Sequence, residues 1–170
     1  MVFRVAGTGA AAISSYQGYY GNFYSDTTQT DGGVSGTPME FEHTVEGAGV
    51  SVVADGSGKY NRLTFANAGV YNIQFSAQLH NQGGGGAGTT VNIWLRYNGN
   101  VVANTDTKVT VNTNSPFVVA AWNFIQTVAA NGYVELIWLS DNANIKIEAT
   151  AASSPAPAIP ATIITAVQVR

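Results

Sequence analysis

The chain has 170 residues, enough for one buried hydrophobic core, and this length predicts a single domain. Only 10% of the residues are charged, against ~25% in typical soluble domains. The predicted surface is therefore polar but carries few charges. Such a surface is typical of a subunit that buries much of its area in an assembly. A net charge of −3 with scattered basic residues argues against nucleic acid as a partner, and the lack of cysteine excludes disulfides and thiolate metal sites.

The first 25 residues differ in composition from the rest. Small residues come first, followed by aromatic residues among Gly and Ser, without helical or strand periodicity up to about Gly21. We predict an N-terminal arm over residues 1–25 and one domain over residues 26–170. Tyrosine supplies contact area with a polar tip, so the arm suits packing on another chain. A mobile tail whose last aromatic residues join the domain core is the alternative.

From residue 39 onward, short strand-like runs follow one another with turn signals between them and no convincing helix. Asn98-Gly99 and Asn131-Gly132 each predict a tight hairpin, because both residue types tolerate positive φ. Many short strands with such turns predict a sandwich or barrel. The predicted strands are Met39–His43, Val50–Val53, Arg62–Phe65, Gly69–Leu79, Thr90–Tyr97, Asn100–Thr105, Lys108–Val111, Phe117–Thr127, Tyr133–Leu139, Asn144–Ala149 and Thr162–Val169.

The run Gly69–Leu79 has the clearest pattern in the chain. Its side chains alternate between an apolar face (Tyr71, Ile73, Phe75, Ala77, Leu79) and a polar face (Asn72, Gln74, Ser76, Gln78). Successive side chains of a strand point to opposite sides, so this run predicts a half-buried antiparallel strand. The polar face carries amides and a hydroxyl rather than charges, which suits a surface that meets another protein.

The sequence offers no catalytic constellation. Neither His43 nor His80 has a carboxylate or nucleophile nearby at a catalytic spacing. The glycine motifs that begin at Gly7 and Gly83 lack the strand-to-helix context of a dinucleotide or phosphate site. We therefore expect a protein that is not an enzyme and has no cofactor.

Two sets of residues could be imagined as metal ligands, and for both we expect no metal. Glu40, Glu42 and His43 carry alternating charges that are typical of the solvent face of a strand. Asp26 and Asp31 lie in a Thr/Gly-rich loop and could hold Ca²⁺ only with further oxygen ligands.

The three tryptophans suit either burial or sugar stacking, and we favour the core or a subunit contact for all of them. Alternation places Trp94 on the polar face of its strand with Asn92 and Arg96. Trp122 and Trp138 lie in more apolar runs, which predicts core positions.

Three strands carry a resemblance to a known superfamily. These are Phe65-x3-Gly69-x-Tyr71-x-Ile73-x-Phe75, then Val91–Gly99 with its basic-x-Asn-Gly turn, and Ala130–Leu136. Together they resemble the complement globular-head and tumour-necrosis-factor (TNF) jelly rolls over roughly residues 26–170. The glycine loop at 83–88, the Asn92–Arg96 strand and the Pro157–Ala161 stretch look most like bacteriophage virion versions of that fold.

The resemblance implies an all-β jelly roll of two antiparallel sheets that assembles as a homotrimer. It implies a structural virion protein, most directly a capsid decoration (cement) protein that binds the major capsid protein, assembled in the host bacterial cytoplasm. The alternative is a fibre or spike tip that binds a host receptor or glycan. The implied trimer contacts are Tyr71, Ile73, Phe75 and Trp94, and the implied capsid anchors are Phe3, Tyr16, Tyr19 and Tyr20.

Overall fold

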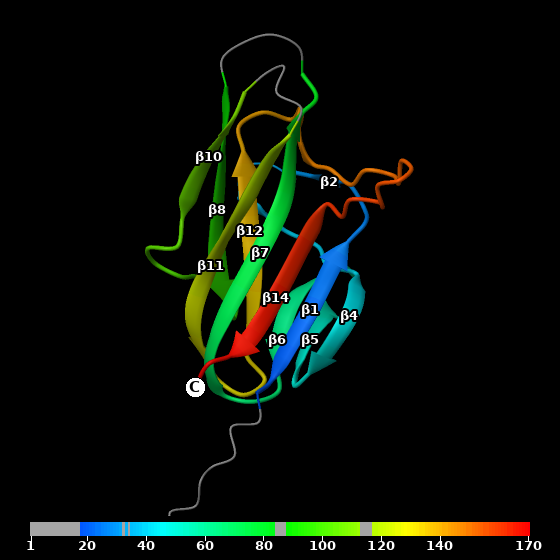
Figure 1. Ribbon diagram of the computed structural model, residues 1–170. Helices are drawn as coiled ribbons and strands as arrows, with labels where there is room; N and C mark the ends of the chain where they lie inside the picture. Colours follow the sequence, from blue (N-terminus) through cyan, green and yellow to red (C-terminus); the bar gives the residue numbers. More distant parts are fainter. Residues whose placement is uncertain (1–17, 32, 34, 84–87, 113–116) are drawn as a thin grey trace, which may run out of the picture.

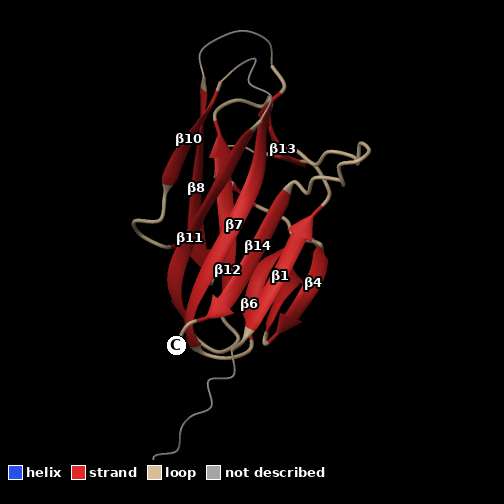
Figure 2. Cartoon of the chain, in the orientation of Figure 1, coloured by secondary structure: helices blue, strands red, loops and turns tan. Residues whose placement is uncertain are grey.

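The structure is a computed structural model that describes residues 18–31, 33, 35–83, 88–112 and 117–170. In these residues the regular elements are all strands, and they form two seven-stranded antiparallel sheets packed face to face (Figures 1 and 2). This confirms the predicted all-β sandwich. The described part of the chain holds no helix of the length and hydropathy needed to span a membrane.

The first sheet is built around β7, the longest of the described strands. Residues 71–77 of β7 pair with β11 along one edge and with β14 along the other, and β1 and β4 extend the sheet beyond β14. Short strands β13 and β2 continue it at one end. The strands of this sheet are β1 (Tyr20–Ser25), β2 (Gln29–Thr30), β4 (His43–Ala48), β7 (Gly69–Asn81), β11 (Val118–Val128), β13 (Ile145–Ile147) and β14 (Thr162–Gln168).

The second sheet has the order β10-β8-β12-β6-β5, with β9 paired to β8 and β3 paired to β12. The Asn98-Gly99 hairpin is confirmed: both residues have positive φ, and Tyr97 pairs with Asn100. The strands are β3 (Thr37–Pro38), β5 (Val50–Ala54), β6 (Tyr60–Phe65), β8 (Thr89–Tyr97), β9 (Asn100–Val101), β10 (Thr107–Val111) and β12 (Tyr133–Ser140).

The hydrophobic core fills the space between the two sheets. Alternate residues of β7, β8 and β14 point inward and are almost fully buried. In β12 the five consecutive residues from Val134 to Trp138 are buried, so this strand is covered on both faces. Trp138 is completely buried in this core, as predicted, whereas Trp122 is only partly buried. At ~25 cal/mol per Å² of apolar surface, this burial is the main stabilising contribution.

Strand β1 was not expected, because it lies inside the predicted arm. Its inward-facing residues are Gly21, Phe23 and Ser25, so only one of the three is apolar and the alternation is hard to see in the sequence. The Phe23 ring fills the space that a side chain at position 21 would occupy, since a Cβ there would lie 2.5 Å from Phe23 Cε2. The sheet therefore begins at Tyr20, ahead of the predicted boundary at residue 26.

Three other predicted elements differ from the structure. Met39 and Phe41 are buried as alternation requires, but their backbone N–H groups donate to Leu136 and Tyr60, so residues 39–42 bridge two strands instead of forming one. Asn131, at φ 61°, makes a tight turn that links β11 to β12 across the two sheets and is not a hairpin. The run predicted over Asn100–Thr105 ends at residue 101.

Candidate functional site

The apolar face of β7 belongs to the core of the single chain. Tyr71, Ile73 and Phe75 are exposed by 0%, 1% and 5%, and Tyr71 donates a hydrogen bond to the Asn67 carbonyl. Their side chains have almost no accessible surface left for contact with another copy. Their assignment to the trimer interface stays a prediction. Alternation showed which residues share a face, but only the packing of the sheets shows which face is covered.

The polar face of β7 lies at the centre of a broad exposed surface. The strand register sets Ile125 of β11 and Val167 of β14 on either side of Asn72, and sets Ala121 and Ile163 on either side of Ser76. Ile125, Val119 and Val167 are 61%, 56% and 46% exposed. We call this surface the uncharged face. Its outward-pointing residues are Asn72, Gln74, Ser76, Gln78, Val119, Ala121, Asn123, Ile125, Ile163, Thr165 and Val167.

The uncharged face combines apolar side chains with neutral hydrogen-bonding groups. Interface cores are depleted of charged residues, because burying an unpaired charge is costly. Part of the face is hollowed, with about 250 Å³ of space between Gln74, Ser76, Ile163 and Thr165. Scattered exposed apolar residues are ordinary on a protein surface, but here they flank the polar row of β7 on both sides, on β11 and on β14. The face is therefore suited to a protein partner.

The edge of the sandwich beside this face is also apolar. Strand β11 pairs only with β7 among the described strands, so its other edge is open. On its inner side Trp122 and Phe124 are half-buried, and Trp122 meets Phe75 edge-on at 4.6 Å between ring centroids. Figure 1 shows β11 and β10 on the same side of the molecule. We call Trp122 and Phe124 the edge cluster.

The structure places Trp94, the fourth predicted trimer contact, away from the other three. It points outward from β8 in the second sheet, beside Asn92 and Arg96 as alternation predicted, and is half-buried. It lines a hollow of about 400 Å³ with Val101, Leu139 and Asp106. The predicted set of four contacts is thus divided between the core and the outer face of the other sheet.

Of the predicted anchor residues, Phe3 and Tyr16 lie outside the described residues. Tyr19 packs against the core and over Gly49, and its carbonyl accepts a hydrogen bond from Gln168 N–H at 2.8 Å. Tyr20 begins β1 and pairs with Ala48. Tyr19 and Tyr20 therefore belong to the folded domain and not to a free arm.

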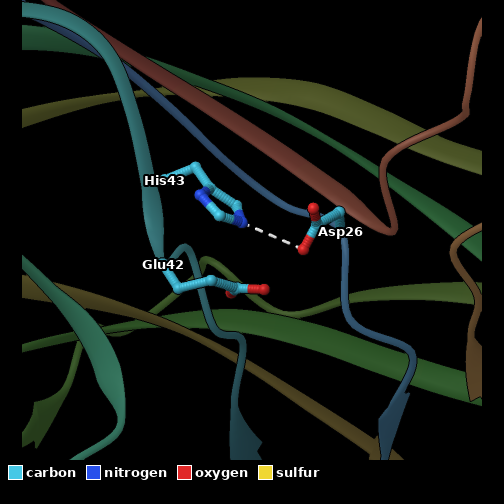
Figure 3. Close-up of side chains that lie close together, drawn as sticks. All are labelled: Asp26, Glu42 and His43. Carbon is cyan, nitrogen blue, oxygen red and sulfur yellow. Dashed lines mark hydrogen bonds and ion pairs between the residues drawn. The ribbon is translucent and has the colours of Figure 1, made fainter.

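A compact cluster of side chains lies where β1 ends and β4 begins (Figure 3). His43 Nε2 lies 2.9 Å from Asp26 Oδ1, and the carboxylate of Glu42 lies beside them. The ligand atoms of all three residues are within 4.8 Å of one another. In the sequence these residues fall into two separate sets of possible ligands, Asp26 with Asp31, and Glu42 and His43 with Glu40. Pairing of β1 with β4, which sets Tyr24 opposite His43, brings them together.

The second histidine makes a similar pair elsewhere in the first sheet. His80 Nδ1 lies 2.7 Å from Glu148 Oε2, which also accepts a hydrogen bond from Gln82. The hydrogen bond from His80 holds the pKa of Glu148 below its usual range. Both histidines thus contact carboxylates distant in the sequence, which sequence spacing could not show. A hydrolytic triad requires a hydroxyl that is hydrogen-bonded to the imidazole. In the described part of the chain neither imidazole has such a partner.

Replacement of Glu148 by glutamine is expected to cost about 1–2 kcal/mol at pH 7, because the charge-assisted hydrogen bonds are weakened. Since the carboxyl pKa is lower in the folded state, its contribution is fully present above the ordinary glutamate pKa of ~4.3 and is lost as the pH falls through the folded-state value. Urea unfolding at pH 7 and pH 3 should therefore show the two proteins converging in acid. Glu46→Gln, at an exposed position of β4, serves as the control and should match wild type at both pH values.

Comparison with solved structures identifies the fold. No family model matches the sequence, and no curated protein matches it by sequence. Among solved structures, the chain matches the Eiger TNF of S. frugiperda with a TM-score of 0.53 and 9% identity, over 90% of this chain and 93% of that one. It matches murine APRIL with a TM-score of 0.54 and 10% identity, over 90% of this chain and all of that one. The fold is the TNF-like jelly roll. At this identity the likeness shows the fold alone.

Proposed function

We propose that this protein is a non-catalytic structural subunit that acts as a cyclic homotrimer, and that the trimer decorates and stabilises a bacteriophage capsid. The uncharged face supports the assembly of several copies. The role on a capsid is supported by the resemblance of the glycine loop and of the Asn92–Arg96 strand to phage virion proteins. In this proposal the partners are two further copies and the major capsid protein, and the protein is located on the outer surface of the virion.

The presence of two different adjoining surfaces supports a ring of copies. The uncharged face and the edge cluster are different surfaces that adjoin along β11. If the edge of one copy packs on the face of the next, the contact is heterologous, and such contacts either close into rings or grow into filaments. A trimeric ring would bury the edge cluster of every copy and suit the local threefold points of an icosahedral shell.

Stabilisation of a shell would follow from repeated burial. Apolar contact contributes ~25 cal/mol per Å², so modest contacts between each trimer and the capsid add up over many sites. Because Tyr19 and Tyr20 are part of the domain, we assign the capsid-anchoring role to the segment before them, with Phe3 and Tyr16 as the remaining candidates. Deletion of residues 2–17 should then release the protein from capsids and leave the trimer intact.

A fibre or spike tip that binds a host glycan is the alternative function, and the hollow beside Trp94 favours it. Half-buried Trp94 lies in that hollow, and Asp106, at its rim, accepts a hydrogen bond from Asn92. Tryptophan surfaces stack on sugar rings, while carboxylate and amide groups bind their hydroxyls. In this alternative the trimer would remain, but the particle would carry few copies.

Two measurements test the proposal. Light scattering after size exclusion should give three times the mass of one chain, and a monomer at high concentration would contradict the trimer. Counting the protein in purified particles then separates the two roles. Hundreds of copies support decoration, whereas a handful would support a fibre tip, and absence from virions would refute both.

A further inference from the structure

We propose that Asp26, Glu42 and His43 form a binding site for one divalent transition-metal ion, of which Zn²⁺ is the best fit. The site lies at the end of β1 and the start of β4, and in the sheet order β14 separates these strands from β7 of the uncharged face. It is therefore separate from the proposed subunit contact. The three residues offer one imidazole nitrogen and two carboxylate oxygens. Zinc binds such mixed nitrogen and oxygen sets, whereas Ca²⁺ and Mg²⁺ prefer oxygen ligands alone.

The imidazole of His43 is already held in the orientation that a metal ligand needs. Its ring stacks on Tyr24, with 4.8 Å between the centroids and 26° between the planes. Tyr24 and His43 are direct partners in the β1–β4 ladder, so the backbone register places the two rings side by side. The Nε2 atom then faces Asp26 (Figure 3). Orientation by a neighbouring group reduces the entropy lost when a ligand binds.

The charges at the cluster favour a cation. In the described part of the chain neither Asp26 nor Glu42 forms a salt bridge with a lysine or arginine. The Glu42 carboxylate accepts a hydrogen bond from the hydroxyl of Ser25, at 2.9 Å. Two carboxylates held close together repel each other, and a bound cation removes this repulsion. By contrast, Glu40 and Glu135 are paired with Lys59 and Arg62.

The side chains have the freedom and the space to close around an ion. Metal–ligand bonds of ~2.0–2.2 Å require the three ligand atoms to approach within about 3.5 Å of one another, so the largest separation of 4.8 Å must shorten. The Asp26 side chain is 60% exposed and can rotate toward the imidazole, which the stack on Tyr24 holds in place. Asp26 also lines a hollow of about 610 Å³, which leaves room for water at a fourth position.

Such an ion would connect the end of β1 to the start of β4. The connecting segment between Asp26 and Glu42 contains β2 and β3, and the ligands come together only when β1 and β4 pair. Binding would therefore favour the folded state and raise the melting temperature as zinc is added. The rise should be absent when a ligand is removed.

The test is calorimetric titration of ZnCl₂ into the full chain after treatment with a chelator, at neutral pH. Wild type should bind one ion per chain, and His43→Ala should weaken this binding more than about tenfold. His80→Ala is the matched control, because His80 contacts a single carboxylate, and it should bind as wild type does. Visible absorption of bound Co²⁺ should follow the same order. A titration with CaCl₂ should show weaker binding than ZnCl₂.

Glu42→Gln keeps the histidine and tests the same site if His43→Ala does not fold. Loss of binding in Glu42→Gln, with an unchanged circular dichroism spectrum, supports the proposal. Three results would overturn it: no saturable zinc binding by wild type, binding unchanged in both ligand variants, or equal loss in His80→Ala. The mass of the assembly is measured separately, so failure here is distinguishable from failure of the proposed trimer.

Discussion

Replacement of Tyr71 by alanine should lower the free energy of unfolding by about 3–5 kcal/mol, the range measured when a large aromatic side chain is removed from a core. Tyr71 is completely buried, and its ring lies 4.5 Å from that of Phe65. The truncation would leave a cavity between the sheets and remove the hydrogen bond to the Asn67 carbonyl. Since domains of this size are stable by only ~5–15 kcal/mol, the loss should be clear in urea unfolding.

The matched control is Gln74→Ala, in the same strand but on the exposed side. A change there should stay within about 0.5 kcal/mol in the dissociated protein, because it removes no buried group. Tyr71→Phe should lie between the two, at about 0.5–1.5 kcal/mol for the hydrogen bond. If Tyr71→Ala instead dissociated the assembly at unchanged stability, the burial of the apolar face would be contradicted.

The substitution Ile125→Glu should dissociate the proposed trimer while leaving the fold intact. Ile125 is 61% exposed on the uncharged face, so the single chain tolerates a charge there. In a closed ring the same position would be buried, and each copy would bring one carboxylate without a partner. We expect the concentration at which half of the chains associate to rise more than about tenfold, measured by analytical ultracentrifugation.

Val45→Glu provides the control for this experiment. Val45 is 59% exposed, almost the same as Ile125, but lies on β4 at the opposite edge of the sheet. It should leave the mass of the assembly unchanged. Dissociation by both substitutions would indicate a general effect of charge, and dissociation by neither would show that the subunits associate through another surface.

Strand β7 illustrates what alternation in the sequence can and cannot reveal. The pattern in Gly69–Leu79 shows two faces of opposite character, and the sequence does not state which one meets another molecule. An apolar face is equally suited to a core and to an interface. Only the second sheet, which covers Tyr71, Ile73 and Phe75, decides between them.

The sequence by itself determined the β character, the strongest strands and the Asn98-Gly99 turn. It predicted no helix, and the described residues contain none. These features are local, since side-chain period and positive φ are properties of neighbouring residues. Weak local signals failed: β1 has a glycine and a serine among its inward residues, and residues 39–42 alternate without forming a ladder.

The tertiary structure decided everything that depends on distant residues. It decided which face of β7 is buried, and it built the uncharged face from three strands that are far apart in the chain. It also brought Asp26 to His43 and Glu148 to His80 across separations of 17 and 68 residues. Such contacts arise from strand order and register, which non-local pairing sets and which a one-dimensional pattern does not contain.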